Sequence, residues 1–193
     1  MSRDLLKHLA PSHVAIIVPS VKKAADYLKT FGCTIGSEDV FEAEGTKEIY
    51  VEYGQTNALL LVEPIKAGPY QRALEKRGPG LHHLAIDVLN LDAYLVSLAG
   101  SGWFIHPVSI RTIKQYQTAW LARPGFPGLI EVHEKDTLND APMFVSGLTL
   151  RMDSAPTTLL KAVGLNAIVK PGAKEELFFS RQCVTLSDLW SSK

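Results

Sequence analysis

The chain has 193 residues, the length of one domain or of one domain with a short extension. Its 20 basic and 20 acidic side chains give a formal net charge of +0, so the overall charge attracts neither nucleic acid nor an anionic membrane. Hydrophobic residues make up 46% of the chain, which is enough for a buried core and excludes wholesale disorder.

Cysteine usage and apolar runs point to an intracellular setting. Cys33 and Cys183 form no CxxC or Cys/His pair, so we expect reduced, buried thiols and no zinc knuckle. Purely apolar runs such as Ala58–Val62 fall far short of the roughly 20 residues of a membrane span, and the first residues lack the apolar core of a signal peptide. We expect a cytoplasmic protein.

An internal repeat is the main signal. His13–Val18 reads HVAIIV, and His83–Val88, 70 residues later, reads HLAIDV. The same offset, without a gap, also aligns Ser20 with Asn90, Leu28 with Leu98, Gly32 with Gly102, and Tyr50 with Trp120. The chain therefore contains two copies of one unit.

Each copy begins with a strand that is followed by an amphipathic helix, over 18–32 and 88–102. Ser20 and Asn90 are suited to cap the helix starts, and Gly32 and Gly102 to close the helix ends. Three strand-like runs follow, near 33–41, 47–53 and 58–63 in the first copy and near 103–108, 116–121 and 128–134 in the second. Each copy is predicted to be a βαβββ unit.

Two further segments complete the prediction. Residues 64–80 form a linker with one short helix around Tyr70–Arg77. In the extension we expect a strand at 148–152, a helix at 157–163 that ends at Gly164, and strands at 176–180 and 182–186. These are compatible with a partial third module or a degenerate βαβ module.

We therefore predict an α+β fold in which two βαβββ modules, residues 12–64 and 82–134, form a cupped mixed sheet. The paired modules are expected to make one domain, residues 1–134, and residues 135–193 a C-terminal extension.

Three polar residues on these strands suggest a metal site. Alternate residues of a strand share a face, so His13 and His83 are expected to converge inside the cup, and Glu131 lies on an otherwise apolar strand face. Two imidazoles and one carboxylate from separate strands are a facial-triad ligand set for a divalent ion. His82 is expected to point to the opposite face as a bystander, and His133 to lie beside Glu131.

The paired units, the stretch GLHHLAIDV at 80–88 and GLIE at 128–131 resemble the vicinal oxygen chelate (glyoxalase/dioxygenase) superfamily. The segment from Gly68 to His83 is most similar to the methylmalonyl-CoA epimerase family. The resemblance covers about residues 12 to 134. It implies metal ligands at His13, His83 and Glu131, and one bound divalent ion, which could be Co, Mn, Zn, Ni or Fe.

The resemblance also implies a fourth ligand, Glu or Gln, on the last strand of the first copy. The repeat offset places this ligand at Leu61 and the distance from Pro64 places it at Leu60, and both residues are apolar. Glu63 could substitute only if the strand bulged. The fourth ligand is therefore missing in this sequence.

The candidate catalytic residues are Glu48 and Glu131. Glu48 is the candidate base for proton transfer next to a carbonyl, with Glu42 and Glu44 as runners-up and a solvated strand edge as the non-catalytic alternative.

The resemblance favours an enzyme, a metal-dependent epimerase, isomerase or lyase that acts on a small-molecule carbonyl or thioester substrate. A non-haem iron dioxygenase that uses the two-His one-Glu triad and a non-catalytic small-molecule-binding protein remain open, as does a homodimer. No nucleic acid or membrane partner is expected.

Overall fold

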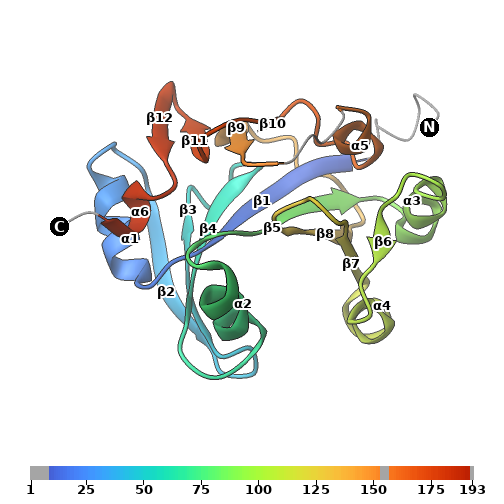
Figure 1. The fold of residues 1–193 in the computed structure, drawn as a ribbon, viewed down its shortest axis with the longest axis horizontal. Coiled ribbons are helices and arrows are strands. Elements are labelled where there is room, and N and C mark those ends of the chain that lie inside the picture. Colours follow the sequence, from blue (N-terminus) through green and yellow to red (C-terminus); the bar gives the residue numbers. More distant parts are fainter. Residues whose placement is uncertain (1–8, 153–156, 192–193) are drawn as a thin grey trace.

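The computed structural model describes residues 9–152 and 157–191; the first eight residues, for which no signal peptide is expected, lie outside this part (Figure 1). A mixed sheet of eight strands, in the order β2-β3-β4-β1-β5-β8-β7-β6, forms the body of the molecule. A second sheet of four strands, in the order β10-β9-β11-β12, packs on it. The predicted α+β class and cupped mixed sheet are confirmed.

The first module has the predicted βαβββ order. Its elements are β1 (Leu9–Ile17), α1 (Val21–Lys29), β2 (Ile35–Phe41), β3 (Thr46–Val51) and β4 (Ala58–Pro64). The Ser20 side chain accepts a hydrogen bond from the Lys23 amide at the start of α1, and Gly32 after the helix has a φ of 79°. The expected caps are confirmed for this copy.

The second module follows the same plan with one added helix. It comprises β5 (Gly80–Val88), α3 (Leu91–Ser97), β6 (Phe104–Ile105), α4 (Ser109–Tyr116), β7 (Thr118–Ala122) and β8 (Leu129–Glu134). Asn90 caps α3 as expected. Its second strand, β6, is shorter than the predicted strand near 103–108. Helix α4 was not predicted, because its apolar residues are few and Ile110 is 75% exposed.

The two modules meet along β1 and β5, which pair antiparallel at the centre of the sheet. His13 lies opposite Ala85 and Ala15 lies opposite His83, so the ladder has a pseudo-twofold axis between Val14 and Leu84. On the outer sides, β1 pairs in parallel with β4, and β5 pairs in parallel with β8. The repeat in the sequence is therefore a rotational symmetry of the sheet.

The two faces of the large sheet are covered differently. Helices α1 and α3 and the small sheet pack on one face, where Val14, Ile16 and their neighbours form the main core. The other face carries a small apolar cluster of Ala15, Ile17, Leu60 and Val62. Helix α2 (Pro69–Arg77), the helix predicted in the linker, packs on this cluster.

The extension contains the predicted elements and two more. They are β9 (Val145–Leu150), α5 (Thr157–Ala162), β10 (Val169–Pro171), β11 (Glu176–Phe179), β12 (Gln182–Thr185) and α6 (Asp188–Ser191). From β9 to β12 their order is β-α-β-β-β, as in the first module, and α6 follows. However, β9 lies between β10 and β11, whereas the first strand of each module pairs with the last strand of that module.

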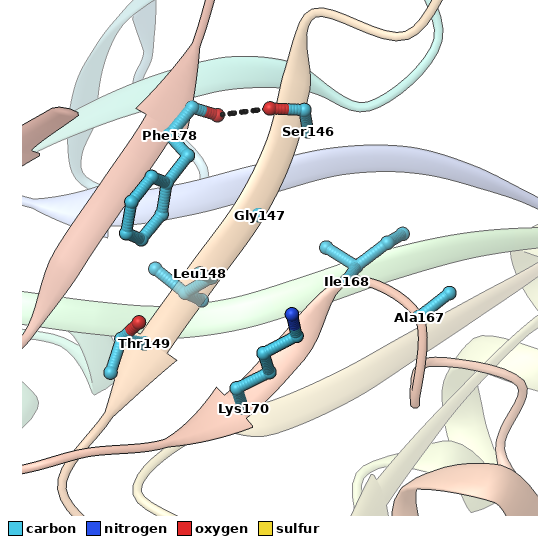
Figure 2. Close-up of a pocket in the computed structure, with 8 residues that line it drawn as sticks. All are labelled: Ser146, Gly147, Leu148, Thr149, Ala167, Ile168, Lys170 and Phe178. Atoms are coloured by element: carbon cyan, nitrogen blue, oxygen red, sulfur yellow. Dashed lines mark hydrogen bonds between the residues drawn. The ribbon is translucent and has the colours of Figure 1, made fainter. Parts of the chain in front are cut away.

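The small sheet is joined to the large one by apolar packing. Phe179 of β11 is 1% exposed and contacts Phe31, next to α1, and Phe144, with ring centroids 6.1 and 5.1 Å away. On the side turned away from this core, Lys170 and Phe178 border a hollow of about 260 Å³ (Figure 2). The extension thus completes the cover of the convex face of the large sheet.

The cysteine prediction is partly wrong. Cys33 is half-buried and burial raises the pKa of its thiol to about 11, but Cys183 is exposed, because it lies on the outward side of the edge strand β12.

Among the helices of the described residues, none combines the length and the apolar character that a membrane span requires.

Candidate metal centre

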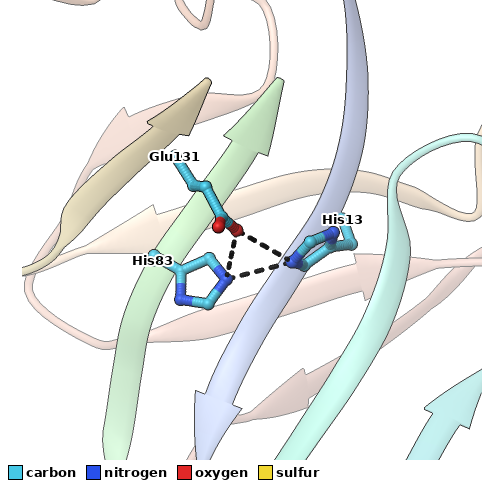
Figure 3. A group of neighbouring side chains, drawn as sticks. All are labelled: His13, His83 and Glu131. Carbon is cyan, nitrogen blue, oxygen red and sulfur yellow. Dashed lines mark hydrogen bonds and ion pairs between the residues drawn. The ribbon is translucent and has the colours of Figure 1, made fainter. Parts of the chain in front are cut away.

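Three predicted ligands from three adjacent strands converge on the concave face of the sheet. His13 comes from β1, His83 from β5 and Glu131 from β8 (Figure 3). Glu131 lies opposite Ala85 across the β5–β8 ladder, and Ala85 lies opposite His13, so the small alanine leaves space between the three side chains. The strand register thus brings together residues that are up to 118 positions apart in the sequence, since 131 − 13 = 118.

The ligand atoms are close enough to share one ion. His13 Nε2 lies 3.0 Å from His83 Nε2, and Glu131 Oε2 lies 3.3 Å from His83 Nε2 and 3.8 Å from His13 Nε2. Metal bonds of about 2.1 Å that meet at a right angle separate their ligand atoms by roughly 3 Å. The donor set of two nitrogens and one oxygen therefore fits a divalent ion with open positions.

The protonation states also suit a metal ligand set. Burial and the neighbouring His83 lower the pKa of His13 to about 3, so its imidazole is neutral at neutral pH. Burial opposes ionisation of Glu131, but its hydrogen bonds with His133 and His83 outweigh this effect and hold its pKa below the usual value. A neutral imidazole and an ionised carboxylate are the forms that bind metal.

Aromatic rings flank both histidines symmetrically. Tyr50 contacts His13 edge-on with ring centroids 5.8 Å apart, and Trp120, its partner in the repeat, contacts His83 at 5.1 Å. Tyr50 lies on β3, which is next to β4, the outer neighbour of β1. Trp120 lies on β7, which is next to β8, the outer neighbour of β5. They limit the rotation of the two imidazoles.

His133 supports the carboxylate, as expected from the sequence. Its Nε2 lies 3.2 Å from Glu131 Oε1, and its Nδ1 lies 3.2 Å from Asp87 Oδ1. Although burial opposes a charge on this ring, the two carboxylates raise the pKa of His133 to about 9. His133 therefore acts as a cation between two carboxylates in the metal-free protein.

The prediction for His82 is wrong. Its Nδ1 lies 2.8 Å from His83 Nδ1, and its ring packs on Tyr70 at 4.5 Å, so it belongs to the side-chain cluster and is not a bystander. The reason is a β-bulge: Leu81 pairs with Ile16 and His83 with Ala15, which leaves His82 as an extra residue. The prediction assumed that side chains alternate strictly between the two faces along this strand, which would have placed His82 on the face opposite His83.

Leu60, and not Leu61, takes the position on β4 that corresponds to Glu131 on β8. Leu60 lies opposite Ala15 in the β1–β4 ladder, as Glu131 lies opposite Ala85 in the β5–β8 ladder. Glu63 does not approach the cluster, because its carboxylate accepts a hydrogen bond from the Val21 amide, 2.9 Å away, at the start of α1. Among the described residues, the cluster therefore offers three candidate ligands.

Glu48 lies at one end of the concave face. It is 9% exposed, pairs with Val62 across the β3–β4 ladder and accepts a hydrogen bond from the Thr46 hydroxyl at 2.8 Å. Burial raises the pKa of its carboxyl group. It is not a solvated strand edge, whereas Glu42 and Glu44 are exposed.

A cavity of about 360 Å³ opens at the other end of the concave face. Its walls include His13, Tyr50, Asp87, His133 and Lys135. Glu48 does not line it, since α2 packs over the apolar residues next to Glu48. The three-ligand cluster thus lies between the open cavity and the buried carboxyl group.

The chain is similar to known proteins. It is 32% identical over 89 residues to the human mitochondrial methylmalonyl-CoA epimerase, which corresponds to 45% of this chain and 51% of that protein. The chain thus matches about half the length of this curated relative.

Two solved structures share the fold. A hypothetical protein from Bacillus halodurans C-125 is 24% identical with a TM-score of 0.56, over 67% of this chain and 96% of that chain. Methylmalonyl-CoA epimerase from Mycobacterium tuberculosis is 23% identical with a TM-score of 0.51, over 69% of this chain and 91% of that chain. A sequence profile matches residues 12–117, more than half of the chain. The chain therefore belongs to the glyoxalase/bleomycin resistance protein/dioxygenase superfamily, as its repeat and its strand motifs indicated.

Proposed function

We propose that this protein is a metal-dependent epimerase or isomerase that moves a proton next to a carbonyl group. The observation that carries the proposal is the convergence of His13, His83 and Glu131 around one point in a chain of this superfamily. The similarity to a methylmalonyl-CoA epimerase supports this class of reaction and an acyl thioester substrate.

His13, His83 and Glu131 would hold the ion on the concave face of the sheet. A bound divalent ion supplies positive charge next to the substrate carbonyl oxygen, where negative charge develops when the neighbouring proton leaves. Tyr50 and Trp120 restrain the imidazoles, and His133 restrains the carboxylate of Glu131.

Glu48 is the proposed base. Its carboxylate takes the proton from the carbon next to the carbonyl, and the electron pair of that C–H bond moves toward the carbonyl oxygen. A proton then returns to the carbon from an acid that exchanges with solvent. A base with a raised pKa is better matched to this task than an ordinary carboxylate.

The geometry constrains how a substrate binds. The reacting carbon must lie on the Glu48 side of the three ligands, while the rest of the molecule extends into the cavity beside His13 and Lys135. This arrangement suits an acyl thioester that carries a carboxyl or hydroxyl group at carbon 2, or an α-hydroxy ketone, since each places a second oxygen near the carbonyl.

The test is hydrogen exchange in heavy water. The metal-loaded protein should exchange the proton next to the carbonyl of a 2-substituted acyl thioester without consuming oxygen. Glu48→Gln should slow exchange and retain bound metal, whereas His83→Ala should lose both. Exchange that is unchanged in Glu48→Gln would remove Glu48 from the mechanism, and no exchange over a panel of thioesters and hydroxy ketones would refute the proposed function.

A second candidate is favoured by one observation. Leu60 at the fourth ligand position leaves the two-His one-Glu set, which suits non-haem iron oxygenases. The iron-loaded protein would then consume oxygen in the presence of a catechol. If both assays are negative and a small molecule binds tightly, the protein is a binding protein without this chemistry.

A further inference from the structure

We propose that the residue before each histidine ligand is a positioning residue that fixes the ring of that ligand: His82 for His83, and Ser12 for His13. This inference rests on the metal site of the proposed function. It assigns roles to two residues that do not bind the ion themselves.

The backbone provides the first argument. In the antiparallel β1–β5 ladder, the pairs Pro11–Ile86 and His13–Ala85 leave Ser12 as an extra residue, and the pairs Leu81–Ile16 and His83–Ala15 leave His82 as an extra residue. The two irregularities are related by the pseudo-twofold axis. A bulge redirects the side chain of the extra residue, so each can reach the ring that follows it.

The hydrogen bonds provide the second argument. His82 Nδ1 lies 2.8 Å from His83 Nδ1, and Ser12 Oγ lies 3.5 Å from His13 Nδ1. The Nε2 atoms of the two ligands face each other across 3.0 Å. His82 and Ser12 therefore each contact the Nδ1 atom of the histidine that follows, which is the ring nitrogen on the far side from the two facing Nε2 atoms.

This arrangement determines where the protons are when an ion is bound. Each ligand then offers the lone pair of Nε2 to the ion and carries its proton on Nδ1. The Nδ1–H group of His83 donates to His82 Nδ1, which must be an acceptor, so His82 carries its own proton on Nε2. The Nδ1–H group of His13 is directed at the Ser12 hydroxyl oxygen. A hydrogen bond of this kind orients a ligating histidine and increases its basicity.

His82 is itself held in place. It is 7% exposed, and its ring lies against Tyr70 of α2 with centroids 4.5 Å apart and planes inclined by 31°. Because water has little access, no solvent molecule replaces the acceptor when His82 is changed. The linker helix between the modules thus contributes indirectly to the metal site.

The two positions should differ in strength. The contact at His83 is short and buried, whereas the contact at His13 is at the limit of a hydrogen bond and only partly buried. Removing the acceptor at position 82 should therefore weaken metal binding more than removing the hydroxyl at position 12.

The test separates hydrogen bonding from packing with two complementary variants. His82→Phe keeps a ring against Tyr70 but removes the acceptor, while His82→Asn places an oxygen near the former Nδ1 but loses the stacked ring. We expect Zn²⁺ affinity, measured by competition with a chromophoric chelator, to fall about 10- to 100-fold in His82→Phe. It should fall by a few-fold at most in His82→Asn and in Ser12→Ala.

A spectroscopic measurement on the unaltered protein completes the test. In ¹⁵N-labelled, Zn²⁺-loaded protein, His83 should be protonated at Nδ1 and His82 at Nε2 only. Protonation of His83 at Nε2, or a His82→Phe protein that binds Zn²⁺ as tightly as the unaltered chain, would overturn the inference and leave the metal site intact. An unaltered chain that binds no Zn²⁺ would instead refute the site itself.

Discussion

Replacing Leu60 by Glu should add a fourth ligand to the metal site. The pseudo-twofold axis that places Leu60 opposite Ala15 places Glu131 opposite Ala85, so a carboxylate at position 60 would face the same two imidazoles from the other side. Affinity for divalent ions rises with the number of charged ligands. We expect Leu60→Glu to bind Zn²⁺ or Mn²⁺ at least tenfold more tightly, a gain of about 1.4 kcal/mol.

The same change should destabilise the metal-free protein. Leu60 is 4% exposed and packs with Ala15, Ile17 and Val62, so its loss removes about 1.5–3 kcal/mol of apolar burial. The new carboxylate also lies near Glu131 without an ion to compensate it, which adds to the cost. Denaturant unfolding with and without Zn²⁺ measures both effects, because bound ligand stabilises by RT ln(1 + [L]/Kd).

Two control variants make this experiment decisive. Leu60→Ala loses the packing without gaining a ligand, so it should have a lower free energy of unfolding and should bind metal no more tightly than the unaltered protein. Leu61→Glu places the carboxylate in the main core on the opposite face, where Leu61 is fully buried, and should destabilise without any gain in affinity. The symmetry argument fails if Leu60→Glu binds metal no more tightly than Leu60→Ala.

Three further predictions follow from single contacts. Glu63→Gln should cost about 0.3–1 kcal/mol of stability, because the amide oxygen can still accept from the Val21 amide but the negative charge at the start of α1 is lost; metal stoichiometry should not change, and loss of metal would make Glu63 a ligand. Phe179→Ala should cost about 3–5 kcal/mol in urea unfolding, and Phe178→Ala clearly less; equal losses would mean that the small sheet is not packed as described. In the folded, metal-free protein, burial raises the pKa of Glu48 above its unfolded-state value of about 4.5, so the folded state is favoured while this group is protonated. The free energy of unfolding should therefore fall as the pH rises from about 4.5 through the folded-state pKa. Glu48→Gln should lack this decline in urea titrations across pH, and a parallel pH profile would contradict the burial of Glu48.

Much of the fold could be predicted because the repeat and the apolar periodicity encode it directly. An offset of 70 residues located both strand–helix units, their caps and the two histidines without any knowledge of the strand pairing. Helix α4 was not predicted because it is short, with eight residues, and only Ser109 among them is buried. The strand order of the extension also could not be predicted, since local patterns do not specify which strands become neighbours.

The site shows a similar division. Its three candidate ligands could be predicted because a carboxylate and two symmetric histidines on apolar strands require a partner. The contact between His82 and His83 depends on a bulge, which shifts the alternation of side chains and leaves no mark in the sequence. Likewise, the ambiguity between Leu60 and Leu61 was resolved only by the register of β1 with β4.

The central claim is tested most directly by locating the ion in crystals of the protein grown with Co²⁺. Anomalous diffraction should show one cobalt peak per chain within about 2.0–2.2 Å of His13 Nε2, His83 Nε2 and a Glu131 oxygen, and no such peak in His83→Ala crystals. A cobalt-loaded protein whose metal peak lies away from these three side chains would contradict the proposed centre.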